Sequence, residues 1–353
     1  MSSNQIELIS LLCKNRDAYP HKVSKVAVEE THISWIILTG QFAYKVKKEL
    51  KFGHILDFST LALRKKFCQK EVDINRVLCR DMYRGVVKLV KQKREQEQEE
   101  EDDGIKLVDL KSKGKALEYA VKMLEIPQKF RMDNLLQEGK INSDTIDKLT
   151  SILVEFHCST PTNRKIKSFG RPEFMKRKVD ENFATLSRLA AINPKLEMRL
   201  GLFIKNNSNL FLERIKDEKI RDIHGDLYLK NVFVVLHNKK FYLYDRIEYN
   251  DSLRYADVAE DVAHLAMDLD FHGRCDLRKH LISAYMLQGK DAGLENIVYF
   301  LMCYKACVRV KVSLFHAKGL DKTNSDDRKK IEQAEDEARN HLQLAESYLE
   351  QLL

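Results

Sequence analysis

Hydrophobic and polar residues along the 353-residue chain follow strand-like spacing in the first third and helical spacing afterwards. Short runs that alternate or stay apolar predict strands, whereas apolar residues three and four apart predict helices. The predicted strands are 23–29, 35–39, 41–47, 85–90, 105–110 and 117–124, with a helix over 63–80 among them. Residues 1–14 are typical of an amphipathic helix and not of a secretion signal.

From residue 127 onward the pattern is mostly helical. Helices are predicted over 144–158, 171–189, 194–216, 257–270, 276–288, 293–318 and 326–353. The last is highly charged, and we expect a surface helix that packs through one stripe of residues, namely Ile331, Ala338, Leu342 and Leu349. The segment 91–103 carries seven acidic residues between Glu95 and Asp103, so it predicts a solvated or disordered loop.

One motif interrupts this helical region. It is His224-Gly225-Asp226-Leu227-Tyr228-Leu229-Lys230-Asn231, followed by an apolar run, a turn and a second aspartate, Asp245. Phosphoryl transfer from ATP needs one carboxylate that accepts a hydroxyl proton, and an amide oxygen and another carboxylate that bind Mg²⁺. The Asp-x4-Asn spacing is that of the kinase catalytic loop. We therefore expect Asp226 to be the catalytic residue and Asn231 and Asp245 to bind the metal.

A lysine on the third predicted strand fits the same chemistry. Phe42-Ala43-Tyr44-Lys45 stands where kinases carry V-A-I-K, whose lysine holds the α- and β-phosphates and needs a carboxylate from the following helix. Glu71 is the expected partner. Lys47 faces the same side of the strand, but Lys45 is preferred because Lys47 and Lys48 are expected to lie at a fraying strand end. The alternative for Lys45 alone is a solvated strand lysine.

Two further segments are candidates for nucleotide binding. The turn 30–34 contains no glycine, unlike the Gly-rich loop of protein kinases, so it either binds phosphate through its amides and the hydroxyls of Thr31 and Ser34 or is only a turn. Residues 118–127 are expected to connect two lobes, with Met123 or Leu124 beside the adenine. The expected fold is α+β and protein-kinase-like: an N-terminal lobe over 1–125, a helical lobe over 126–320 and a charged helix over 321–353, with ATP between the lobes.

Composition restricts the partners. The chain is 44% hydrophobic and 32% charged, and its seven cysteines are scattered without a C-x-x-C pair, which favours a reduced cytoplasmic protein without a structural metal. The apolar stretch 297–315 contains Lys305, Arg309 and Lys311, which argues against a membrane span. A net charge of +8 suits a polyanionic nucleotide, and no recognition-helix or zinc-finger pattern is present, so neither nucleic acid nor membrane is expected as a partner.

The chain resembles the aminoglycoside phosphotransferase family, in particular a bacterial and archaeal branch of it. The matching segments are 31–35, 44–48, 56–59, 120–123, 224–231 and 245–251. The loop motif is shared by the wider family, while D-x-I-E-x-N-D and the N-lobe segments are more specific to the branch. The resemblance implies a kinase-like fold and phosphorylation of a small-molecule hydroxyl with ATP and Mg²⁺. It leaves the acceptor open, because relatives phosphorylate choline, homoserine, sugars and other alcohols.

Two positions depart from the related patterns. Tyr228 stands where protein kinases carry a lysine and the branch carries a histidine, and a phenol is uncharged near neutral pH. Either Lys230 replaces that charge or the rate is reduced. Arg246-Ile247-Glu248 replaces the Phe-Gly that follows the metal-binding aspartate in protein kinases, so we expect no Phe-dependent switch. Glu248 either supports the metal site or forms a surface salt bridge.

Several charged residues after the motif have open assignments. Relatives brace the catalytic loop with an aspartate, and we expect Asp257 to do so, with Asp261 on the same helix face. His224 is expected to support the loop and not to act as a base. Lys305 and Arg309 share one face of a buried helix and must be paired. They either form ion pairs with Asp257, Asp261, Asp268 or Asp270, or recognise an acidic or phosphorylated acceptor.

Three other functions remain open at this point. A Ser/Thr protein kinase is disfavoured because the glycine loop, D-F-G and A-P-E segments are missing. A non-catalytic nucleotide-binding scaffold is favoured by Tyr228 and by the glycine-free turn, but all three ligand-type residues are present. The third is a kinase-like protein that acts on a partner protein.

Overall fold

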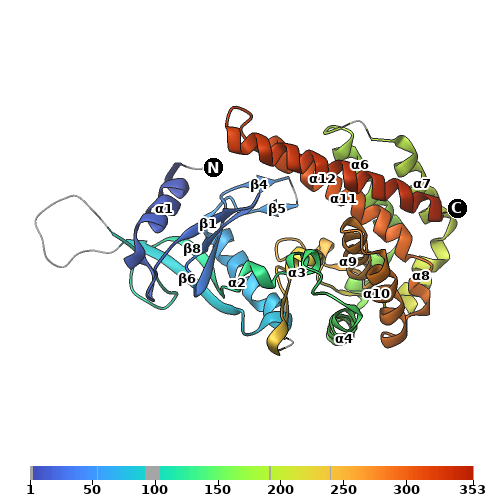
Figure 1. Ribbon diagram of the computed structural model, residues 1–353, viewed down its shortest axis with the longest axis horizontal. Coiled ribbons are helices and arrows are strands. Elements are labelled where there is room, and N and C mark those ends of the chain that lie inside the picture. The colour runs from blue at the N-terminus through green and yellow to red at the C-terminus, as the bar shows by residue number, and fades with distance from the viewer. Residues whose placement is uncertain (1–2, 54, 92–103, 191, 239, 353) are drawn as a thin grey trace, which may run out of the picture. The chain divides into compact units, whose positions relative to one another are not determined.

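A computed structural model describes residues 3–53, 55–91, 104–190, 192–238 and 240–352 of the chain. These residues form two compact units (Figure 1). Unit 1 contains residues 1–128 and 242–250, and unit 2 contains residues 129–241 and 251–353. The acidic segment lies almost entirely outside the described residues, at 92–103, so the loop expected there stays a prediction.

Unit 1 is built on a six-stranded antiparallel sheet in the order β1-β2-β3-β8-β6-β7. Its strands are β1 (Ala27–Glu30), β2 (Ser34–Leu38), β3 (Phe42–Lys47), β6 (Tyr83–Lys91), β7 (Ile105–Asp109) and β8 (Ala116–Leu124). All six predicted strands are present, although the first begins at Ala27. The short pair β4 (Lys51–Phe52) and β5 (Leu56–Asp57) was not predicted, because strands of two residues leave no periodic signal.

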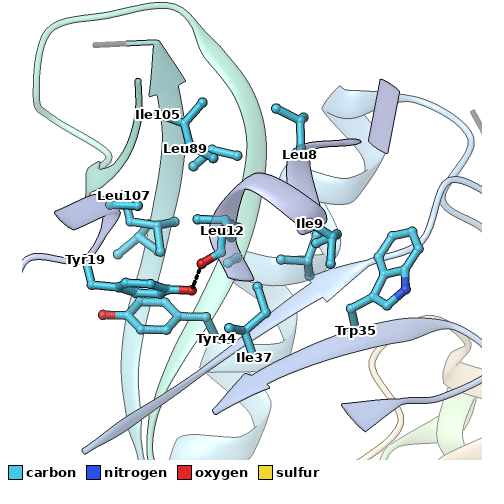
Figure 2. Close-up of a cluster of buried hydrophobic side chains, with 14 of the residues drawn as sticks. Leu8, Ile9, Leu12, Tyr19, Trp35, Ile37, Tyr44, Leu89, Ile105 and Leu107 are labelled. Atoms are coloured by element: carbon cyan, nitrogen blue, oxygen red, sulfur yellow. Dashed lines mark hydrogen bonds between the residues drawn. The ribbon is translucent and has the colours of Figure 1, made fainter. Parts of the chain in front are cut away.

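Side chains from opposite faces of β3 contact two helices of unit 1, α1 (Ser3–Lys14) and α2 (Leu61–Cys79). Side chains alternate along a strand. Tyr44 and Val46 join the apolar cluster that contains Leu8, Ile9 and Leu12 of α1 (Figure 2). Lys45 and Lys47 extend from the other face and reach α2. The apolar alternation that anchors β3 under α1 therefore directs both lysines to the same side.

The cluster beneath α1 also ties the N-terminal segment to the sheet. Tyr19 and Tyr44 lie with ring centroids 5.5 Å apart, and the Tyr19 hydroxyl donates to the Leu12 carbonyl at 2.8 Å (Figure 2). Trp35 and Ile37 of β2 are buried in the same cluster. This core fixes the register of β2 and β3, because a shift by one residue would turn the apolar side chains of both strands away from α1.

Unit 2 is mainly helical. Its helices are α3 (Met132–Gln137), α4 (Ser143–Ser159), α5 (Arg164–Lys167), α6 (Pro172–Leu186), α7 (Pro194–Asn206), α8 (Ser208–Lys216), α9 (Ala259–Phe271), α10 (Cys275–Gln288), α11 (Val298–Gly319) and α12 (Ser325–Leu349). The single helix predicted over 194–216 is wrong. Asn207 leaves the helical region (φ −110°, ψ 28°) and its side-chain amide donates to the Phe203 carbonyl, so the chain forms α7 and α8 instead.

The buried helix α11 is confirmed, and α12 runs beside it (Figure 1). The predicted stripe of α12 is largely wrong. Of its four members only Ala338 is buried, and the buried face consists of Ala334, Ala338, His341, Ala345 and Tyr348. Alanines at this contact let the two helices approach closely, which a stripe of larger side chains would prevent.

Within the described residues, no helix combines the length and apolar character that crossing a membrane requires.

Four short strands hold the motif at 224–231. The strand β9 (Ile220–Asp222) precedes it and pairs with β12 (Tyr255–Asp257), while β10 (Val232–Val235) follows it and pairs with β11 (Lys240–Leu243). The sequence division placed residues 242–250 in the helical lobe. They cluster with unit 1, because Arg246 hydrogen-bonds to the Ile74 carbonyl and the Asn75 side chain of α2.

Candidate functional site

Two lysines and three carboxylates form a charged group in unit 1, here called the lysine cluster: Lys45, Lys47, Glu71, Asp245 and Glu248. Lys45 Nζ lies 2.9 Å from Glu71 Oε1 and 2.5 Å from Asp245 Oδ1. Lys47 Nζ lies 2.6 Å from Glu71 Oε2 and also contacts Glu248. Four of the five residues are buried, whereas the Asp245 side chain is 40% exposed. The predicted contact between Lys45 and Glu71 is therefore present.

The reason given for preferring Lys45 over Lys47 is wrong. Strand β3 extends through Lys47, which is fully buried, and Lys48 is buried as well. The Lys47 ammonium lies 4.9 Å from the centroid of the Phe58 ring, a cation–π distance. Glu248 pairs with this ammonium and is itself buried, so the surface salt bridge considered for Glu248 is also wrong. Lys45 stays the preferred phosphate ligand because it contacts the exposed Asp245.

The charge state of the lysine cluster follows from these contacts. Burial raises the pKa of Glu71, but the ammonium groups of Lys45 and Lys47 outweigh burial and lower it to about 2. Burial raises the pKa of Glu248 above its usual value in spite of Lys47. Burial lowers the pKa of Lys45, yet Asp245 and Glu71 together raise it well above its usual range. The Lys45 ammonium therefore stays protonated and positively charged at neutral pH.

The backbone at Asp245 has an unusual conformation. Its φ of 67° lies in the left-handed region, which non-glycine residues adopt rarely and often at functional sites. The Asp245 N–H donates to the Tyr83 hydroxyl at 3.1 Å, and the next N–H, of Arg246, donates to the Asn75 side chain at 2.9 Å. These contacts with β6 and α2 hold the Asp245 carboxylate toward Lys45.

In unit 2 an aspartate braces the start of the motif, but it is Asp261 and not Asp257. The N–H groups of His224 and Gly225 donate to the two Asp261 oxygens at 2.7 and 2.9 Å. Asp257 instead pairs with Arg214 and accepts the Ala259 N–H at 2.9 Å. Helix α9 begins at Ala259, so Asp257 lies before the helix and binds its first N–H, while Asp261 lies in the first turn and reaches the loop.

The predicted catalytic and metal-binding residues of the motif are linked through the loop itself. Asn231 Nδ2 donates to the Asp226 carbonyl at 2.9 Å, and no hydrogen bond to Asn231 Oδ1 is found in the described part of the chain. This oxygen is the atom that a Mg²⁺ ligand would use. The Asp226 side chain is 41% exposed, so a reactant can approach its carboxylate. The buried His224 ring accepts the Asp226 N–H at 3.4 Å, which is the supporting position expected for it.

Tyr228 contacts a histidine and an arginine that come from different helices. Its ring stacks on His264 of α9, with centroids 5.4 Å apart and planes at 14°. The guanidinium carbon of Arg309, on α11, lies 4.6 Å from the Tyr228 ring centroid. His264 Nδ1 is 3.8 Å from Asp226 Oδ1. His264 was not selected from the sequence, where its only signal was its position three residues after Asp261 on a buried helix.

The cation next to Tyr228 is thus Arg309. Lys230, which the sequence suggested as a replacement charge, has its ammonium 3.7 Å from Glu337 Oε1, and its side chain is 40% exposed. Arginine keeps its charge at every physiological pH and stacks well on aromatic rings. Arg309 therefore supplies the positive charge beside the motif that Tyr228 cannot carry.

His264 predicts a loss of stability in mild acid. Burial, together with the charges of Lys305 and Arg309, holds the pKa of its imidazole well below the usual 6.5. The unfolded chain then binds a proton below pH 6.5 that the folded chain does not, so unfolding becomes easier as pH falls. We expect up to about 1.4 kcal/mol per pH unit from this residue. Urea unfolding at pH 7.5 and 5.5 should show a smaller pH effect in His264→Gln than in the wild type, and an exposed control, His237→Gln, should match the wild type.

The remaining candidates, Thr31, Ser34 and Met123, lie in or beside the sheet of unit 1. The Thr31 hydroxyl donates to the Ser34 carbonyl and accepts the Ser34 N–H, both at 3.0 Å, so it closes the turn between β1 and β2. The Ser34 hydroxyl is buried and has no hydrogen-bond partner among the described residues. Met123 is buried in β8, paired with Ala43 of β3 and Tyr83 of β6. Their roles in nucleotide binding stay predictions.

Comparison with known proteins decides the fold. No protein-family model matches the chain. Proteins of Mycobacterium tuberculosis and Mycobacterium bovis, both described as uncharacterized, are 29% identical over 293 residues, which are 81% of this chain and 54% of theirs. The chain thus spans about half the length of these relatives. A choline kinase from Cryptosporidium parvum matches 98% of this chain and 97% of its own with a TM-score of 0.50 and 11% identity. The chain has the protein-kinase-like fold.

A putative aminoglycoside phosphotransferase from Ralstonia eutropha covers 97% of this chain, with a TM-score of 0.47 and 10% identity. The α+β kinase-like fold expected from the sequence is confirmed by the choline kinase match. At 11% identity that match concerns the fold alone, because one fold hosts many activities. What this kinase-like chain does must be argued from its own side chains.

Proposed function

We propose that the chain transfers the γ-phosphate of ATP to a hydroxyl group of a small molecule. The observation that carries the proposal is the buried Lys45, whose ammonium is held by Glu71 on one side and by the exposed Asp245 on the other. A lysine fixed in this way presents a permanent positive charge for phosphate. The braced motif with Asp226 and Asn231 adds the residues that phosphoryl transfer requires.

The side chains fit a nucleotide with its metal ion. Asn231 Oδ1 of unit 2 and the Asp245 carboxylate of unit 1 are each oxygen donors, the kind of ligand that Mg²⁺ prefers, and the Asp245 side chain is 40% exposed. Bound there, Mg²⁺ would neutralise charge on the phosphates. Lys45 would contact the α- and β-phosphates, and Glu71 would hold its ammonium in place.

Asp226 performs the proton chemistry in this proposal. Its carboxylate accepts a hydrogen bond from the acceptor hydroxyl and takes the proton as the bond from the acceptor oxygen to the γ-phosphorus forms. The bond between that phosphorus and the β,γ-bridging oxygen breaks, and ADP leaves with the electron pair. Positioning and charge neutralisation supply most of the rate enhancement. His264 stays neutral, because its pKa is lowered. It therefore adds no positive charge 3.8 Å from the Asp226 carboxylate that would make this carboxylate a weaker base.

Lys45→Met tests the nucleotide role. We expect transfer to fall about 10²-fold, because a fixed positive charge on the phosphates is lost. The fold should persist, since Lys47 still neutralises Glu71. ADP release under saturating acceptor, with a circular dichroism melt beside it, measures both quantities. The control is Lys65→Met, an exposed lysine of α2. Unchanged kcat and KM for ATP in Lys45→Met would exclude the assignment.

A non-catalytic nucleotide-binding protein is the second candidate. Tyr228 favours it, since protein kinases carry a lysine at this position. Saturable ATP binding without transfer to any alcohol would identify such a protein. The position of Arg309 at the Tyr228 ring argues against it and for transfer, because Arg309 supplies the positive charge that Tyr228 lacks.

A further inference from the structure

We infer that Arg309, Lys305 and His264 form an anion subsite beside Asp226, and that the acceptor is an alcohol bearing a carboxylate or phosphate group. The inference rests on the proposed phosphotransferase function, which it makes more specific. All the residues concerned belong to unit 2. They are held by α9 and α11, which pack against each other.

Arg309 has binding capacity that the protein does not use. It is half-buried, and within the described residues it forms neither an ion pair nor a hydrogen bond. Its contact is the Tyr228 ring, whose centroid lies 4.6 Å from the guanidinium carbon, and this contact uses none of its N–H groups in a hydrogen bond to the described residues. Five N–H donors in a planar fork suit the two oxygens of a carboxylate or phosphate.

Lys305 adds a buried positive charge. Its ammonium lies 3.0 Å from Glu260 Oε2, and Lys178 of α6 lies 2.5 Å from Glu260 Oε1. Two buried lysines therefore share one carboxylate. The nearby Asp257 is already paired with Arg214. An unbalanced buried charge is costly, and a bound anion would offset it.

His264 is the third member. Its side chain is 2% exposed, and neither ring nitrogen has a hydrogen-bond partner in the described part of the chain. Buried polar groups are nearly always hydrogen-bonded, so both nitrogens of this imidazole are available to a bound ligand. The ring lies one turn beyond Glu260 on α9, stacks on Tyr228 and has Nδ1 3.8 Å from Asp226. It thus joins the proposed anion subsite to the reacting carboxylate.

The sequence left two assignments open for Lys305 and Arg309, and the structure separates them. None of the four aspartates named as partners pairs with either cation, because each has other contacts: Asp257 with Arg214, Asp261 with the loop N–H groups, Asp268 with the Leu229 N–H, and Asp270 with Arg278. Lys305 pairs with Glu260 instead. The other assignment therefore applies to Arg309: it binds the anionic group of the acceptor, and the acceptor hydroxyl points to Asp226.

Titration with inorganic phosphate and with acetate, followed by NMR on the full chain, tests the subsite. Arg309→Gln should weaken phosphate or acetate binding at least about tenfold, which corresponds to about 1.4 kcal/mol. The matched control is Lys318→Gln, an exposed cation on the same helix, which should bind as the wild type does. Tighter binding of phosphate assigns a phosphorylated alcohol, and tighter binding of acetate assigns a carboxylate. Equal binding by Arg309→Gln and the wild type overturns the proposal.

A second measurement covers the case in which Arg309→Gln does not fold. In the wild type, the bound anion should shift the imidazole signals of His264, identified by their loss in His264→Gln. Unshifted signals at saturating phosphate and acetate overturn the subsite. Lys45→Met separates the two claims: we expect it to impair ATP use and to leave this shift intact. An unimpaired Lys45→Met would reject the nucleotide chemistry, whereas an unshifted His264 rejects only the subsite.

Discussion

Asp226→Asn is expected to lower kcat for phosphoryl transfer by about 10²–10⁴-fold, the usual contribution of a positioned general base. The amide keeps the size of the side chain but cannot take a proton from the acceptor hydroxyl. The backbone contacts that hold the loop, from His224 and Gly225 to Asp261, do not involve the Asp226 carboxylate. ATP binding should therefore persist while turnover is lost.

The measurement is ADP release with a saturating acceptor, together with a nucleotide-binding titration of the same protein. Asp217→Asn, an exposed aspartate at the end of α8, is the matched control and should behave as the wild type. Transfer by Asp226→Asn at the wild-type rate would show that another group accepts the proton.

Glu71→Gln is expected to destabilise unit 1 by about 1–3 kcal/mol, because Lys45 and Lys47 each lose one buried charged hydrogen-bond partner and keep another. Glu71 is the carboxylate that both Lys45 and Lys47 share, and all three are buried. Its pKa of about 2 lies below its usual 4.5, so its stabilisation is present above pH 4.5 and is lost as pH falls toward 2. The difference in the free energy of unfolding between the variant and the wild type should therefore reach its maximum at pH 7.

Urea unfolding followed by Trp35 fluorescence measures this effect. Trp35 is the single tryptophan of the chain and lies in the core of unit 1, so its signal reports on that unit. Asp73→Asn removes an exposed carboxylate from the same helix and should change the free energy of unfolding by less than about 0.5 kcal/mol. A similarly small change in Glu71→Gln would mean that the lysine cluster contributes little to the fold.

The sequence predicts those parts of the site that follow from local spacing. Alternation along β3 places Lys45 on a defined face, and helical spacing brings Glu71 within its reach. The burial of Lys47 and Glu248 was missed, because a charged pair is buried only when tertiary contacts neutralise both members. Local patterns carry no record of such contacts between residues 201 positions apart.

The other corrections concern features that spacing alone does not show: where a helix begins, and which separate segments meet. Asp257 and Asp261 share a helix face in any periodic interpretation, and only the start of α9 at Ala259 shows which of them braces the loop. The group formed by Tyr228, His264 and Arg309 joins three separate segments. Its members interrupt no periodicity, so the sequence could name Tyr228 as unusual but could not place Arg309 above it.

The proposed function requires that ATP gives up its γ-phosphate to an alcohol. ³¹P NMR of the wild-type protein with Mg²⁺, ATP and pools of hydroxyl compounds, both neutral and anionic, tests it most directly. We expect a new phosphomonoester signal in an anionic pool, growing in step with ADP and absent in Asp226→Asn. Saturable ATP binding with neither ADP nor a phosphomonoester in any pool would contradict it and would leave a nucleotide-binding scaffold.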